Sequence, residues 1–113
     1  MVVVSERIAI GQTIDFVDKP VKRVDYESHR VVVVRIESDY YALGDRCSHA
    51  NFSLSEGEVY EAEREIECWK NGSTFSLVDG KPQSLPAVKP VPVYEIEVDG
   101  GTVYLLIPEE RQK

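Results

Sequence analysis

The chain has 113 residues and a mass of 12.8 kDa, which suits one small domain because a second core would need at least about fifty more residues. An apolar share of 42% and six Tyr exclude a disordered chain. The net charge of −7 repels nucleic-acid phosphates and anionic membranes. It either favours a basic partner protein or serves solubility alone.

The first ten residues hold one short apolar run that charged residues interrupt, too short for a signal peptide or a membrane span. We therefore expect a cytoplasmic protein that does not bind nucleic acid or a membrane. The cytoplasm keeps thiols reduced, so Cys47 and Cys68 are expected to be core residues or metal ligands and not a disulfide.

Short apolar patterns predict strands along most of the chain, and no stretch has helical periodicity. Turn signals separate them at Ser28-His29, Ser38-Asp39, Asp79-Gly80 and Asp99-Gly100-Gly101. In chain order, the predicted strands cover residues 2–10, 21–27, 31–36, 40–43, 64–68, 75–78, 94–98 and 102–107. Many short strands predict an all-β fold, a small antiparallel sandwich or incomplete barrel, formed by residues 1–113 as a single domain.

Two segments do not read as strands. Residues 44–57 are rich in Ser, Asn and Asp, and residues 81–92 contain four prolines. Long irregular loops in a small domain usually carry function.

Potential metal ligands follow two of the predicted strands. Cys47-Ser48-His49 lies near the start of the first irregular segment, and Cys68-Trp69-Lys70-Asn71-Gly72 begins at the last residue of the strand predicted at 64–68. Two such turns side by side would gather their side chains at one point. Thiolate and imidazole are the donors that hold iron or zinc. Taken singly, the cysteines could be buried core residues and His49 a turn residue.

The order of these segments resembles the Rieske [2Fe-2S] proteins, whose two loops read Cys-x-His and Cys-x-x-His. The resemblance runs through ALGDRCSH, LSEGEV, ECWKNGSTFSL, DGKP and LPAVKPVPVYEIEVDGGTVYLL, and so covers nearly the whole chain. It implies a cluster-binding part at about residues 44–92, with Leu85-Pro86 beginning the proline loop that shields the cluster. It also implies that each loop gives one thiolate to one iron and one imidazole to the other.

One ligand position departs from the family pattern, because Asn71 stands where the second histidine is expected. Cys47, His49 and Cys68 remain as metal ligands, and the neutral amide of Asn71 is a poor match for imidazole. Three outcomes follow from this: a labile [2Fe-2S] cluster, a mononuclear metal held by Cys47, His49 and Cys68, or an empty scaffold. His29, the other histidine, is expected to be a surface residue at a hairpin turn.

Neighbouring positions indicate which kind of Rieske protein the chain resembles. Members of cytochrome bc complexes carry a loop disulfide where this chain has Phe52 and Trp69, and they carry a serine and a tyrosine where it has Ser73 and Phe75. In those members both hydroxyls donate hydrogen bonds to cluster sulfurs and raise the potential, so the resemblance implies that Ser73 is a cofactor-binding residue. Because Phe75 has no hydroxyl, we expect a potential in the lower part of the family range of about −150 to +300 mV.

The resemblance therefore implies a soluble ferredoxin of the oxygenase-associated type. Such a protein is not an enzyme but an electron carrier, and its partners are a ferredoxin reductase and a terminal oxygenase. A cofactor-free interaction or assembly subunit is the alternative from another class. A zinc enzyme built on the three remaining ligands lacks an evident general base.

Overall fold

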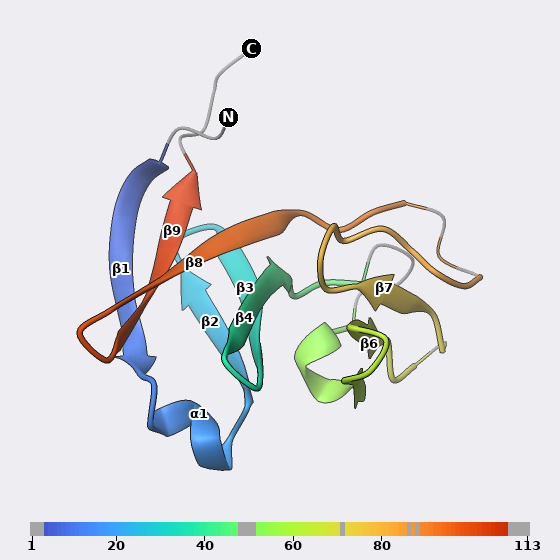
Figure 1. Ribbon diagram of the computed structural model, residues 1–113. Helices are drawn as coiled ribbons and strands as arrows, with labels where there is room; N and C mark the ends of the chain where they lie inside the picture. The colour runs from blue at the N-terminus through green and yellow to red at the C-terminus, as the bar shows by residue number, and fades with distance from the viewer. Residues whose placement is uncertain (1–3, 48–51, 71, 86, 88, 109–113) are drawn as a thin grey trace.

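The computed structural model describes residues 4–47, 52–70, 72–85, 87 and 89–108, which form two antiparallel sheets (Figure 1). The larger sheet has the strand order β1-β9-β8-β4-β3-β2, and the smaller has the order β5-β6-β7. The predicted all-β class, a small antiparallel sandwich or incomplete barrel, is confirmed. The strands are β1 (Val4–Gln12), β2 (Val21–Tyr26), β3 (His29–Ile36), β4 (Asp39–Gly44), β5 (Val59–Tyr60), β6 (Glu65–Glu67), β7 (Thr74–Ser76), β8 (Val93–Asp99) and β9 (Thr102–Pro108).

Strand β3 is buried on both faces because it lies between two hydrophobic clusters. Val31 and Val33 belong to a cluster with residues of β1 and β9, whereas Val32 and Val34 belong to one with residues of the smaller sheet. A strand with apolar surroundings on both sides must be apolar at nearly every position. This explains why residues 31–36 form a continuous β-branched run.

The larger sheet curls around the first of these clusters. Ile10 of β1 and Leu105 of β9 share the cluster with Val33 of β3, although β1 and β3 are not neighbours in the sheet. The one-turn helix α1 (Asp15–Asp18) adds Phe16, whose ring meets Tyr40 edge-on at 5.4 Å. A helix of four residues is too short to show a period in the sequence. The structure describes no helix that is long and apolar enough to cross a membrane.

The β-hairpin predicted near the C-terminus is confirmed. Strands β8 and β9 pair in register from Glu95 opposite Leu106 to Asp99 opposite Thr102. Gly100 and Gly101 form the turn with φ of 60° and 80°, a backbone conformation that glycine adopts without steric cost.

Two other turns lie one residue earlier than predicted. Strand β2 ends at Tyr26 and β3 begins at His29, so His29 is the first residue of a strand and not part of a turn. It is half-buried, and its ring lies edge-on to Tyr94, with 2.8 Å between His29 Nδ1 and the Tyr94 hydroxyl. The expectation of a surface histidine was wrong, because Tyr94 of the distant strand β8 covers it.

The smaller sheet stands beside the larger one, at the end of β4 (Figure 1). Ile66 of β6 and Phe75 of β7 are fully buried, and they pack in one cluster with Leu43 of β4. The 3-10 turn η1 (Leu54–Glu56) contributes the buried Leu54 to the same cluster. The predicted cluster-binding part thus shares a hydrophobic core with the outer face of the larger sheet.

Candidate metal centre

The first loop leaves β4 and returns to η1 through a narrow neck. The amide of Cys47 donates a hydrogen bond to the carbonyl of Phe52 at 2.9 Å, and Arg46 forms a β-bridge with Ser53. Cys47 is 2% exposed. The neck therefore fixes the cysteine at the base of a loop whose tip, with His49, lies outside the described residues.

The second loop leaves β6 and has a similar neck. The amide of Cys68 donates to the carbonyl of Ser73 at 2.7 Å, and the amide of Gly72 donates back to the carbonyl of Cys68 at 2.9 Å. Gly72 has a φ of 78°, which closes the turn in the left-handed region. Cys68 is fully buried. Asn71 lies outside the described residues.

The two loops lie against each other. The rings of Phe52 from the first loop and Trp69 from the second meet edge-on, with centroids 5.2 Å apart. The ammonium of Lys70 lies 5.7 Å from the Phe52 ring centroid and 6.0 Å from that of Trp69. An aromatic contact thus stands at the two positions where the resemblance predicts that a disulfide is absent. Such pairs contribute about 0.5–1.5 kcal/mol beyond burial.

Both cysteines belong to the same buried cluster and are not joined by a disulfide. The sequence-based expectation that Cys47 and Cys68 come together is met to this extent. Two sulfurs at adjacent loop bases fit the thiolate half of a [2Fe-2S] site. For the imidazole half, the sequence offers His49 and, at position 71, an asparagine that supplies no imidazole.

The proline segment is attached to the second loop. The Gln83 amide donates to the Thr74 carbonyl at 2.7 Å, and Pro82 forms a β-bridge with Phe75. The Ala87 amide donates to the hydroxyl oxygen of the fully buried Ser73 at 3.0 Å. Ser73, predicted to lie near the cofactor, therefore anchors this segment. Pro86 lies outside the described residues.

The surroundings of the second loop are acidic. Glu56, Glu58 and Glu67 line a hollow of about 400 Å³ together with Trp69, whose side chain is 49% exposed. The Tyr60 hydroxyl donates a hydrogen bond to Glu67, and this bond raises the pKa of Tyr60 to about 12. An acidic rim beside the loop matches the negative charge of the whole chain.

Sequence reasoning did not identify one buried charge next to the first loop. Asp45, two residues before Cys47, is fully buried, and its carboxylate lies between Arg23 and Arg30. Arg23 comes from β2 and Arg30 from β3, and both precede the loop by at least fifteen residues. The only local signal was an acidic residue that directly follows the buried end of a strand.

A model of the Rieske [2Fe-2S] domain matches residues 6–95 of the chain. The chain belongs to the Rieske [2Fe-2S] domain family. This match spans both loops, both cysteines and the proline segment, so the family assignment made from the sequence is confirmed.

Relatives and solved structures place the chain among the ferredoxins of this family. The 3-phenylpropionate/cinnamic acid dioxygenase ferredoxin subunit of Escherichia coli is 37% identical over 79 residues, which cover 70% of this chain and 74% of that protein. The ferredoxin of carbazole 1,9a-dioxygenase from Nocardioides aromaticivorans has a TM-score of 0.85 and 30% identity, over 93% of this chain and all of that one. A complex of reduced oxygenase and oxidized ferredoxin in carbazole 1,9a-dioxygenase contains a chain with a TM-score of 0.83 and 30% identity, matched over 93% of this chain and 97% of that one.

Proposed function

We propose that this Rieske protein carries one electron at a time from a ferredoxin reductase to a terminal oxygenase. The observation that carries the proposal is the pair of buried cysteines at the bases of two adjoining loops. The dioxygenase ferredoxin subunits that the chain resembles support the same role. The chain is an accessory electron-transfer component and performs no bond chemistry of its own.

We propose that Cys47 and Cys68 hold one iron as thiolates and that His49 binds the other iron. A [2Fe-2S] cluster supplies a one-electron couple when bound. The neck hydrogen bonds of Cys47 and Cys68 hold the sulfur donors in place, so little rearrangement accompanies the change of charge. The aromatic pair of Phe52 and Trp69 joins the two loops, and the hydrogen bond from the Ala87 amide to Ser73 anchors the proline segment to the second loop.

Asn71 makes this site different from a standard Rieske site. Its amide oxygen is neutral, hard and weakly basic, so it binds iron less well than imidazole does. We expect a cluster that is lost more easily than in a two-histidine protein. With one imidazole ligand, the reduction potential should depend on pH through one ligand ionisation and not two.

The experiment compares the wild-type chain with the Asn71→His variant. We expect visible absorption, iron and sulfide content and an electron spin resonance signal after reduction in both proteins, with slower cluster loss in the variant. Voltammetry over pH should show one ligand-linked step in the wild type and two in Asn71→His. Two steps in the wild type would contradict the ligand assignment.

A second candidate function follows from the same residue. Loss of a ligand at position 71 also suits a Rieske-like fold that serves as a cofactor-free assembly subunit. That function predicts no iron and no sulfide in the wild type after anaerobic purification and reconstitution. Metal without sulfide, bound in a manner that Cys47→Ser abolishes, would instead indicate a mononuclear site at Cys47, His49 and Cys68.

A further inference from the structure

Asp45 closes the neck of the first loop with its backbone and its side chain together. Its amide donates to the carbonyl of Arg30 at 2.8 Å, and its carbonyl accepts from the amide of Leu54 at 2.5 Å. Its carboxylate Oδ1 accepts from the amide of Ser55 at 2.8 Å. One residue therefore joins β3, the start of the loop and the turn η1 to which the loop returns.

The charge of Asp45 is buried and is compensated by arginines. Its side chain is 0% exposed, and its Oδ2 lies 3.5 Å from Arg30 Nη2 and 3.8 Å from Arg23 Nε. Arg30 Nη2 also donates to the hydroxyl of Ser53 at 2.7 Å, on the returning side of the neck. A buried charge that loses its partner is strongly destabilising. Asp45 and Arg30 thus depend on each other.

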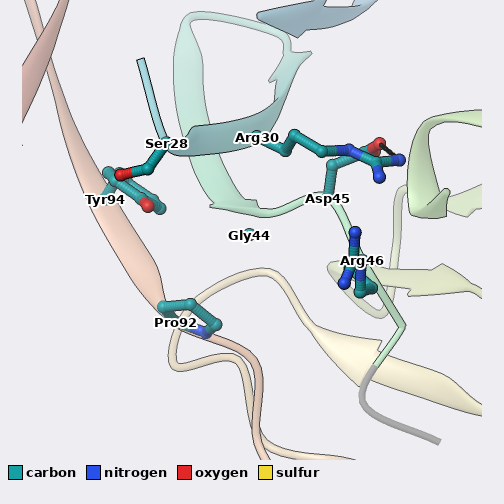
Figure 2. A pocket seen from close by; sticks show the side chains of 7 residues that line it. All are labelled: Ser28, Arg30, Gly44, Asp45, Arg46, Pro92 and Tyr94. Atoms are coloured by element: carbon teal, nitrogen blue, oxygen red, sulfur yellow. Dashed lines mark ion pairs between the residues drawn. The ribbon is translucent and has the colours of Figure 1, made fainter. Parts of the chain in front are cut away.

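One member of the pair, Asp45, lies close to the first cysteine in the chain. Figure 2 shows the Arg30 side chain extended to Asp45 at the wall of a hollow of about 260 Å³, with Arg46 below them. Asp45 is two residues from Cys47, so their Cα atoms are at most about 7 Å apart. The Asp45 carboxylate is fully buried, whereas the Arg30 side chain is 33% exposed. Salt therefore screens the charge of Asp45 less than it screens an exposed charge.

We propose that Asp45 and Arg30 are positioning residues that hold the Cys47 loop and set the reduction potential of the centre through their opposite charges. The negative charge of Asp45 disfavours the electron-rich reduced form, and the positive charge of Arg30 offsets this effect. This inference rests on the proposed electron-carrier function. It assigns a role to two residues that do not bind the metal.

The opposite charges of Asp45 and Arg30 can be tested by the direction in which each variant shifts the reduction potential. Asp45→Asn should raise the reduction potential, whereas Arg30→Gln should lower it, although both variants weaken the same neck. Arg30→Lys keeps the charge and should restore most of the wild-type potential. The double variant Asp45→Asn/Arg30→Gln should lie between the single variants. Shifts of the same sign in both single variants would mean a purely structural role and would overturn the proposal.

An exposed ion pair elsewhere in the sheet supplies matched controls. Arg7 Nη1 of β1 lies 2.9 Å from Glu97 Oε2 of β8, with both side chains more than 40% exposed. Glu97→Gln and Arg7→Gln change the net charge of the chain by the same amounts as the test variants. Their potentials should stay at the wild-type value. Equal shifts in test and control variants would overturn the proposal.

Hydrogen exchange of the protein as purified separates this inference from the proposed function. The amides of Cys47, Leu54 and Ser55 should exchange at least about tenfold faster in Asp45→Asn, whereas Glu97→Gln should leave them unchanged. If the wild type holds no cluster, the electron-carrier proposal fails while this measurement still tests the neck. Unchanged exchange in Asp45→Asn would overturn the positioning role. Arg30→Gln serves as the second variant if Asp45→Asn does not fold.

Discussion

Two tyrosines carry the clearest shifts in proton affinity, and each shift has a single carboxylate as its main cause. Tyr60 donates a hydrogen bond to Glu67 beside the second loop, and Tyr26 donates one to Glu6 at 2.7 Å. The hydrogen bond, aided by desolvation and by the negative charge of the acceptor, raises the pKa of each tyrosine from 10.0 to about 12. The acidic surroundings therefore keep both hydroxyls protonated in strongly alkaline solution.

We predict that Glu67→Gln returns the pKa of Tyr60 towards 10 and leaves the pKa of Tyr26 unchanged. Glu6→Gln should return the pKa of Tyr26 towards 10 and leave that of Tyr60 unchanged. Because the folded-state pKa is raised, the stabilisation from each pair is complete below pH 10 and is lost as the pH rises towards 12. Tyrosinate absorbance measured across this range gives the titrations. A Tyr60 titration that Glu67→Gln does not move would show that the hydrogen bond is not the cause.

At the scale of elements, a strand was predictable where both of its faces are buried or where buried and exposed side chains alternate regularly. The run at 31–36 indicated a strand because β3 is apolar on both faces, and the β8–β9 hairpin was marked by its alternation and by two glycines. The two-residue strand β5 and the four-residue helix α1 were not predictable, because neither is long enough to show a period. The turns at Glu27 and Glu37 lie one residue earlier than predicted. These glutamates adopt a φ of 53° and 57°, which their residue type does not favour, so the sequence did not mark them as turn residues.

One glycine determines how closely η1 approaches β6. A Cβ placed on Gly57 would lie 1.6 Å from the carbonyl oxygen of Glu67, although its φ of −92° suits any residue. The obstacle is therefore backbone contact next to Cys68, and not backbone strain. A flexible side chain could move away from an added methyl group, but a hydrogen-bonded strand cannot do so without opening the sheet.

We predict that Gly57→Ala lowers the free energy of unfolding by about 3 kcal/mol, because β6 must move away from η1. Gly100→Ala is the matched control: Gly100 has a φ of 60° with no atom within 4 Å of the added Cβ, so only the cost of a left-handed backbone applies, about 1–2 kcal/mol. Urea denaturation measures both values. A Gly57→Ala variant as stable as Gly100→Ala would mean that the approach of η1 to β6 is adjustable.

At the scale of the whole molecule, the sequence indicated the site through ligand types that recur in two loops. That reasoning succeeded for Cys47 and Cys68 because each follows a strand, and the strands bring the loop bases into one cluster. It could not find the contact of Asp45 with Arg23 and Arg30, since those arginines join the loop only after β2 and β3 have paired. Long-range ion pairs leave no local pattern in a sequence.

The net charge of −7 should govern the encounter of the reduced protein with small charged oxidants. We predict that added salt slows oxidation by the cation cobalt(III) hexaammine and accelerates oxidation by the anion ferricyanide, because salt screens an attraction in the first case and a repulsion in the second. Stopped-flow measurement of the loss of the reduced protein gives both rates. The double variant Glu61→Gln/Glu63→Gln removes two exposed negative charges from the turn between β5 and β6 and should weaken both salt effects. Reversed salt effects, with salt accelerating oxidation by the cation and slowing oxidation by the anion, would show that a positive local surface at the transfer site, and not the field of the whole chain, controls the approach.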